Sequence, residues 1–212
     1  MSTPAIYEFQ GQDSQPEASL YIHHDGYPAG AAQYYLAACL RSDRGMFERF
    51  IRANERSELV HNGRSHGGSQ YRYTLCGENT FAAHQRVSGS NVWKTIYVGN
   101  LVDFILQETG VRLIKFRDQY LDKDAAKEAI MGHVMAASNA IEQGWIGNAG
   151  SYATDAWNLL TVYMANHGPD NSSSAAQEAI ASIDRELSKQ WAGEYGDQAY
   201  AKWRETFRKV PA

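Results

Sequence analysis

The chain has 212 residues, of which 43% are hydrophobic and 12% aromatic, enough for a packed core, so the composition excludes a disordered chain. The formal net charge is −4, with +5 over residues 41–117 and −8 over residues 118–197, and this balance is not basic enough for a dedicated nucleic-acid binder. No apolar run approaches the roughly 18 residues of a membrane span and the start lacks a secretory signal, so we expect a cytoplasmic protein with no membrane partner.

The start of the chain is polar and rich in turn-forming residues, and we expect residues 1–16 to be a flexible N-terminus. Residues 18–24, ASLYIHH, alternate in polarity, which predicts a β-strand with Leu20 and Ile22 facing the core. Asp25-Gly26-Tyr27-Pro28 then ends the strand, because proline cannot donate a ladder hydrogen bond and Gly26 can take a positive φ. This segment is therefore predicted to be a structural turn.

Two helices are predicted next, at residues 29–42 and 46–56. In the second, Phe47, Phe50 and Ile51 have the spacing of a buried helix face. The solvent-facing side of the same helix then carries three cationic residues, Arg49, Arg52 and Arg56. Residues 61–69, HNGRSHGGS, are glycine-rich and polar, which is typical of a loop.

Three short strands follow at hairpin spacing, at residues 70–76, 80–87 and 92–98. Asn100 is then a good N-cap for a helix over residues 101–109. Residues 111–116 are either a last edge strand or an extended connector.

From Asp118 onwards the pattern is helical only, with helices expected at residues 122–142, 151–166, 173–192 and 197–209. Ser151 and Asp197 are the expected N-caps of the second and fourth. The predicted fold class is α+β. A small, mostly antiparallel sheet with flanking helices forms residues 17–116, and a C-terminal four-helix part forms residues 117–212.

Two segments of the first half resemble a family of small uncharacterised proteins of bacteriophages, prophages and plasmids. In that family a Y-x-H-x-D-G-Y-P-x-G segment follows the first strand, and YIHHDGYPAG at residues 21–30 matches it throughout. QYRYTL at residues 70–75 resembles a later strand of the same family. The resemblance covers residues 18–106 and implies a protein encoded by a mobile element. The family has no agreed catalytic residues, so it assigns none to this chain.

His23 and Asp25 are the candidate catalytic residues, because an aspartate beside a histidine can orient it as a general base. They could also share a metal with His61, His66 or His84, but none of these has a recognised ligand spacing. We favour a third reading, in which Asp25 accepts backbone N–H groups across its own turn. The sequence therefore predicts no metal and no cofactor.

Two further features are candidate binding surfaces. The arginines of the second helix, together with Arg64 and Arg72, could contact an anionic partner, although a solvated helix face is the favoured explanation. Trp145 lies in the glycine-rich connector QGWIGNAG, where an exposed aromatic residue can anchor a partner.

The chain contains no nucleophile motif, phosphate-binding loop or zinc-protease motif. The leading hypothesis is therefore a non-enzymatic, mobile-element protein that binds a bacterial host protein or protein complex. An inhibitor of a host defence system, such as an anti-CRISPR protein, is its most concrete version. One alternative is an enzyme acting on a nucleotide or nucleic acid through His23, Asp25 and the arginines, and another is a phage structural or replication-accessory protein. Nucleic acid is the less favoured partner.

Overall fold

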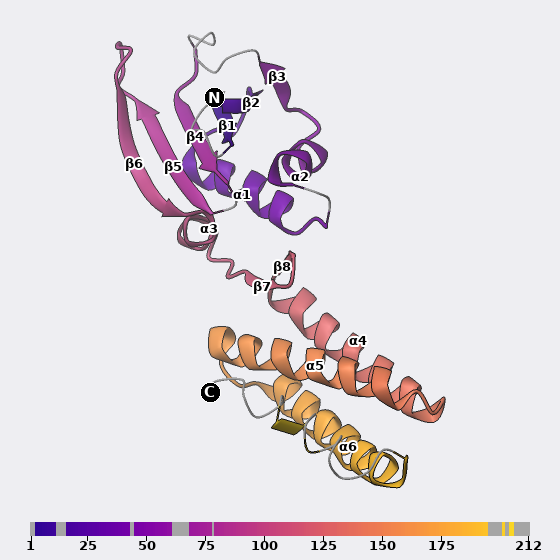
Figure 1. Ribbon diagram of the computed structural model, residues 1–212. Coiled ribbons are helices and arrows are strands. Elements are labelled where there is room, and N and C mark those ends of the chain that lie inside the picture. Colours follow the sequence, from indigo (N-terminus) through magenta and orange to yellow (C-terminus); the bar gives the residue numbers. More distant parts are fainter. Residues whose placement is uncertain are drawn as a thin grey trace. The chain divides into compact units, whose positions relative to one another are not determined.

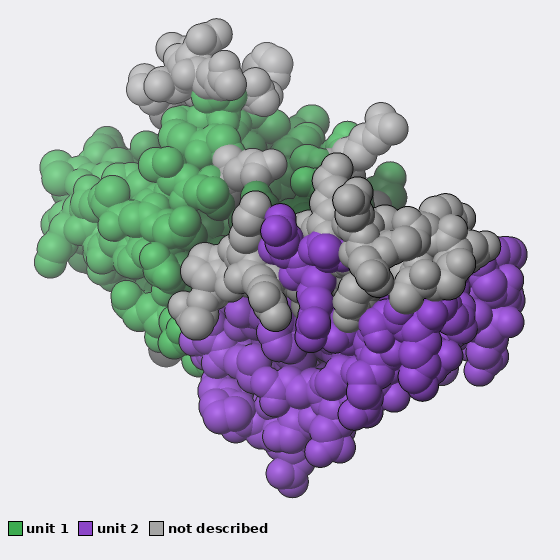
Figure 2. Space-filling model, turned by 60° about the horizontal axis from the view of Figure 1, so that its bottom comes forward, with its two compact units in different colours: residues 1–120 green, residues 121–212 purple. Residues whose placement is uncertain are grey.

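The computed structural model describes residues 3–11, 16–42, 45–60, 68–77 and 79–194, together with residues 201, 204 and 205. The chain divides into two compact units, residues 1–120 and 121–212, which are coloured green and purple in Figure 2. The division lies close to the boundary expected after residue 116. The predicted α+β class is confirmed, with a mixed sheet in the first unit and helices in the second (Figure 1).

The first unit contains a six-stranded sheet in the order β3-β2-β1-β4-β5-β6. β1 pairs antiparallel with β2 and parallel with β4, and every other neighbouring pair is antiparallel. The sheet is therefore mostly antiparallel, as predicted. Its strands are β1 (Ala5–Gln10), β2 (Pro16–Ile22), β3 (Glu58–Val60), β4 (Tyr71–Cys76), β5 (Thr80–Arg86) and β6 (Trp93–Asn100).

The prediction of a flexible N-terminus over residues 1–16 is wrong for residues 5–10. Residues 5–10 form β1, which lies between β2 and β4. Tyr7 and Phe9 point into the main core, while Ile6 and Glu8 are buried on the opposite face. A strand buried on both faces lacks a clean alternation of polar and apolar residues. Because polar residues also flank this short apolar segment, the sequence pattern did not predict β1.

Three helices pack against one face of the sheet: α1 (Pro28–Cys39), α2 (Met46–Ala53) and α3 (Leu101–Thr109). The core between them is largely aromatic. The Tyr7 and Phe50 ring centroids lie 4.9 Å apart, and those of Phe81 and Phe104 lie 4.7 Å apart. Aromatic residues bury large apolar areas and so dominate the stability of a small core.

The ends of these helices follow from local sequence. α1 begins with Pro28, whose fixed φ suits the first helical position. α3 begins after Asn100, whose side chain accepts a hydrogen bond of 2.8 Å from the Val102 backbone N–H, as predicted. α2 is shorter than expected and fully buries only Phe50, so Ile51, predicted to face the core, is 37% exposed.

A two-stranded hairpin, β7 (Ile114–Phe116) and β8 (Gln119–Leu121), precedes the helices α4 (Lys123–Glu142), α5 (Ile146–His167) and α6 (Asn171–Glu194). α5 begins at Ile146, so the prediction of Ser151 as its N-cap is wrong. Ile146 and Ala149 are buried, and this packing extends the helix through a glycine-containing segment. The fourth helix, predicted at residues 197–209, falls mostly outside the described residues.

The second unit has a core of small and aliphatic side chains. Six alanines of α4 and α5 are fully or almost fully buried, which allows the two helices to approach closely: Ala126, Ala137, Ala140, Ala149, Ala153 and Ala156. Within the part of the chain that the structure describes, no helix combines the length and the apolar character needed to cross a membrane.

Candidate functional site

The turn over residues 25–28 packs against the N-terminal end of β1. The Gly26 backbone N–H donates a 2.7 Å hydrogen bond to the Thr3 carbonyl, and the Tyr73 hydroxyl donates a 2.8 Å bond to the Gly26 carbonyl. A Cβ atom on Gly26 would lie 2.5 Å from both the Ala5 Cβ and the Thr3 carbonyl oxygen. Position 26 therefore requires glycine because of a close approach between two backbones.

The left-handed residue of this turn is Asp25, with φ of 54°, and the prediction of a positive φ at Gly26 is wrong. Gly30 is also required by proximity, since a Cβ atom there would lie 1.9 Å from the Asp25 carbonyl oxygen. Both glycines of the DGYPAG segment thus make room for neighbouring backbone. Aspartate tolerates the left-handed conformation better than most residues do, which accounts for its place before Gly26.

The polar side chains of the turn have a different arrangement from the one predicted. His23, His24 and Asp25 are exposed. Among the described residues, no hydrogen bond to the Asp25 carboxylate is recorded, so the predicted capping of the turn by this group is not observed. The turn is held by Gly26, Gly30 and Tyr73, and the side chains of His23, His24 and Asp25 face solvent.

Several polar and aromatic groups gather around these exposed side chains. The Tyr21 hydroxyl lies 3.0 Å from His23 Nδ1, and the Tyr34 hydroxyl donates a 3.2 Å bond to the His24 carbonyl. Partial burial raises the pKa of Tyr34, the Asp25 charge raises this pKa further, and the Arg56 charge opposes both. We call this surface the turn patch; it consists of His23, His24, Asp25, Tyr27, Tyr34 and Arg56.

The predicted arginine face does not exist as one surface. α2 ends at Ala53, so Arg56 follows the helix and belongs to the turn patch, near Tyr34. Arg49 is half-buried and donates a 3.2 Å hydrogen bond from Nη2 to the Asp118 carbonyl. Arg52 is exposed, and Arg64 lies outside the described residues.

Arg72 lies on the face of the sheet opposite the main core. Its Nε atom is 3.7 Å from a Glu8 carboxylate oxygen, and its guanidinium carbon lies 4.4 Å from the centre of the Trp93 ring. Thr74 donates a 3.0 Å hydrogen bond to the other Glu8 oxygen. Arg72 is therefore held by the sheet and is not a free cation. Sequence analysis missed this cluster because Glu8 falls in the segment expected to be flexible.

His84 belongs to the same face of the sheet, with Nδ1 3.1 Å from the Thr95 hydroxyl oxygen. Burial lowers the pKa of His84, and the positive charge of Arg72 lowers it further. Across the described residues, no group of three or more His, Cys, Asp or Glu side chains could hold a metal ion. The other two predicted candidates, His61 and His66, lie outside those residues.

The two cysteines lie in different surroundings. Both are free; Cys39 is buried, and burial raises the pKa of its thiol to about 12. Cys76 donates a 2.7 Å hydrogen bond to the Gln10 side-chain oxygen. A nucleophilic cysteine needs a lowered pKa, and Cys39 shows the opposite shift.

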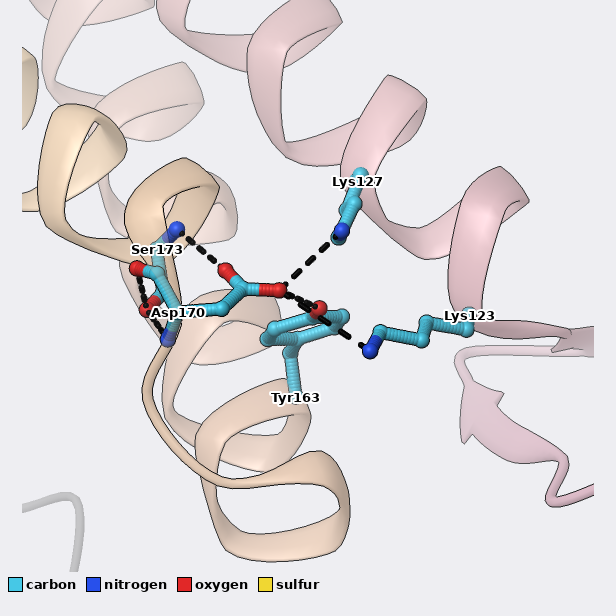
Figure 3. A network of polar contacts seen from close by, with 5 residues as sticks. All are labelled: Lys123, Lys127, Tyr163, Asp170 and Ser173. Carbon is cyan, nitrogen blue, oxygen red and sulfur yellow. Dashed lines mark hydrogen bonds and ion pairs between the residues drawn. The ribbon is translucent and has the colours of Figure 1, made fainter.

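A polar network joins the three helices of the second unit (Figure 3). Asp170 caps α6 by accepting a 2.9 Å bond from the Ser173 backbone N–H, and its own N–H donates to the Ser173 hydroxyl at 2.8 Å. The other carboxylate oxygen accepts a 2.7 Å bond from the Tyr163 hydroxyl and lies 3.0 Å from Lys127 Nζ and 4.0 Å from Lys123 Nζ. The Tyr163 hydrogen bond, then the Ser173 N–H and Lys127, hold the pKa of Asp170 well below its usual range. Donors already occupy both oxygens of the Asp170 carboxylate, so the network serves to hold α4, α5 and α6 together. We call it the clamp.

Trp145 lies at the surface, as predicted. It is 58% exposed at the turn between α4 and α5, where it precedes the first residue of α5. Its role as an anchor for a partner stays a prediction.

Comparisons with known proteins leave the interpretation to the geometry. The chain matches no protein-family model, and neither the curated proteins nor the solved structures include a significant match.

Proposed function

We propose that the chain is a non-enzymatic protein of a mobile genetic element that binds a bacterial host protein complex through the turn patch. One observation carries the proposal: the fold of the turn depends on its glycines and on Tyr73, yet His23, His24 and Asp25 remain exposed beside the 44%-exposed Tyr27. Exposed side chains on a turn that neighbouring backbone holds in place can contact a partner. Tyrosine and arginine are also over-represented among the residues that dominate protein interfaces.

Inhibition of a host defence system, such as a CRISPR effector, is the most concrete form of this proposal. The resemblance of residues 21–30 to proteins of phages, prophages and plasmids supports it. The uneven charge also supports it, since residues 41–117 carry +5 and residues 118–197 carry −8. Opposite charges on one chain steer association with a partner that has a complementary pattern.

The test begins with a pull-down from bacterial lysate, in which the tagged chain is compared with a His24→Ala/Tyr27→Ala variant. Tyr152→Ala is the matched control, because Tyr152 is also exposed but lies on α5. We expect the wild type and the control to retain the same large complex, and titration of that purified complex should show at least tenfold weaker binding by the double variant. Equal binding by a double variant with an unchanged melting temperature would refute a role for the turn patch.

An enzyme acting on a nucleotide or nucleic acid is the second candidate. The contact of His23 with Tyr21 and the charges of Asp25 and Arg56, both of which act on Tyr34, favour it, because a histidine, a carboxylate and a cation can together move a proton and hold a phosphate. Nucleotide or nucleic-acid turnover that disappears in His23→Ala, with the fold retained, would select this candidate over the binding protein.

A further inference from the structure

One face of α4 carries exposed side chains at alternating spacings of four and three residues. The series is Asp124, Glu128, Met131, Met135, the half-buried Ser138, and Glu142. Met131 is 40% exposed and Met135 is 62% exposed. This spacing is that of a helix seam that faces another helix. We call the series the α4 stripe; it is apolar in its middle and acidic at both ends.

A cavity of about 360 Å³ lies beside Met131, between α4 and α6. Its walls are mostly apolar and include Ile130, Met131, Tyr163, Ala175 and Ala176. α6 contributes only alanines and serines to the lining, and these small side chains leave the space open. The volume is at the lower end of the range for binding pockets and exceeds what one inserted side chain needs.

The polar end of this cavity is preformed. Lys127 and Ser173 line the cavity and also belong to the network around Asp170 that fixes α6 against α4 (Figure 3). The Lys127 charge is compensated by Asp170 at 3.0 Å. Glu128 also lines the cavity, and no ion pair of its carboxylate is recorded among the described residues. The uncompensated charge at the cavity is therefore negative.

We propose that the α4 stripe and its cavity bind an amphipathic helix of a partner protein, with apolar side chains in its middle and Lys or Arg at both ends. Anchors three and four residues apart are the pattern by which helices dock into grooves. Methionine suits such a surface because its flexible side chain adapts to different partners. The acidic ends of the stripe match cationic ends on the docked helix.

Charge argues against two other occupants, and the length of the stripe argues against a third. A second copy of the chain would place acidic ends against acidic ends in either orientation. An anionic lipid surface attracts basic residues, whereas the stripe is acidic. A small molecule would account for the cavity but leaves the length of the stripe, about 27 Å at 1.5 Å per residue, without a purpose. The inference concerns the second unit and does not depend on the turn patch.

The probe is a fluorescent peptide of about 18 residues, which spans the stripe when helical, with leucines on one face of its middle and lysines at both ends. A peptide of the same composition, with its leucines spread around the helix, is the control. Fluorescence anisotropy with the full-length protein at low salt should show saturable binding of the first peptide. The control peptide should bind at least tenfold more weakly.

Three variants locate the site. Met131→Gln/Met135→Gln should weaken peptide binding at least tenfold and leave its salt dependence unchanged. Glu128→Lys/Glu142→Lys should weaken binding and reduce the salt dependence. Glu48→Lys/Glu55→Lys makes the same change in net charge at exposed positions of the first unit and should bind as the wild type does.

Ala175→Leu, at an exposed position of the cavity wall, should weaken binding by filling the space. Equal binding of both peptides overturns the proposal, because it indicates attraction by net charge alone. The same conclusion follows if the Glu48/Glu55 variant loses as much affinity as the Glu128/Glu142 variant. Binding that resists both the methionine variant and Ala175→Leu places the peptide elsewhere and also overturns it.

Discussion

Gly26 and Gly147 show how differently one residue type is used within this chain. A Cβ atom on Gly26 would meet the backbone of residues 3–5, whereas a Cβ atom on Gly147, within α5, would have nothing within 4 Å. Backbone neighbours cannot move aside as the end of a flexible side chain can. The local environment therefore predicts opposite effects for the same substitution.

Gly26→Ala should lower the free energy of unfolding by about 1–3 kcal/mol, because the added methyl group overpacks a rigid contact. Gly147→Ala should raise it by up to about 1 kcal/mol, because alanine is the better helix former. Urea denaturation followed by circular dichroism measures both changes. A Gly26→Ala protein as stable as the wild type would show that the turn can move away from β1 without penalty.

Asp25 separates the role of a backbone conformation from that of a side chain. Asp25→Asn should change stability by less than about 0.5 kcal/mol, since asparagine tolerates the left-handed region and no recorded contact of the carboxylate is lost. Asp25→Val should cost about 1–3 kcal/mol, because a β-branched residue is strained at φ of 54°. Chemical denaturation again provides the comparison. A large loss in Asp25→Asn would restore the capping role that sequence analysis assigned to this carboxylate.

The carboxylate of Asp170 joins α4, α5 and α6, and its contribution to the free energy of unfolding depends on pH. The lowered pKa of Asp170 means that its stabilising effect is present above the unfolded-state value of about 3.9 and is lost as the pH falls towards the lower folded-state pKa. Asparagine can still cap α6 but cannot pair with Lys127.

Asp170→Asn should therefore lower the melting temperature at pH 7, and the gap to the wild type should narrow as the pH is lowered below about 4. Glu178→Gln removes one negative charge from an exposed position on α6 and serves as the control. Thermal melts followed by circular dichroism over a pH series give the comparison. A gap that stays constant down to pH 2 would show that the Asp170 charge does not stabilise the clamp.

The elements that sequence analysis predicted well are those with a clear period or cap. β4 and β5 alternate in burial, β6 follows them at hairpin spacing, and α3 has Asn100 as its N-cap. β1 was missed because a strand buried on both faces has no period-two signal. The start of α5 was missed because Gly147 and Gly150 resemble a loop until the helices against which they pack are known. The Asp170 network joins residues that lie more than forty positions apart, from Lys127 to Ser173, so local patterns cannot reveal it.

At the scale of the whole molecule, fewer of the predicted binding arginines are exposed to a partner than the sequence suggested. Arg49 and Arg72 are held by contacts with the Asp118 carbonyl and with Glu8 and Trp93. Arg52 and Arg56 are exposed. Glu8 compensates the charge of Arg72, whereas a backbone carbonyl leaves the charge of Arg49 unchanged, so Arg52 and Arg56 are the arginines of this set that lie exposed to a partner.

Arg52→Glu/Arg56→Glu should leave the melting temperature nearly unchanged and slow the association with the captured host complex. The slower association follows from lost electrostatic steering, so added salt should slow the wild type in the same way. Surface plasmon resonance at two salt concentrations separates association from dissociation. If only dissociation changes, these arginines act as local contacts and do not steer the partner.

The position of β1 also affects how the sheet can form while the chain is being synthesised. β1 forms its parallel pairs with β4, for example Glu8 with Thr74, so β1 leaves the ribosome well before one of its two neighbouring strands has been made. Until about residue 76 has emerged, the nascent chain can offer β1 only the antiparallel β2. Pairings between residues so distant in sequence slow folding. A chaperone that shields residues 5–10 during synthesis would therefore act on the centre of the sheet.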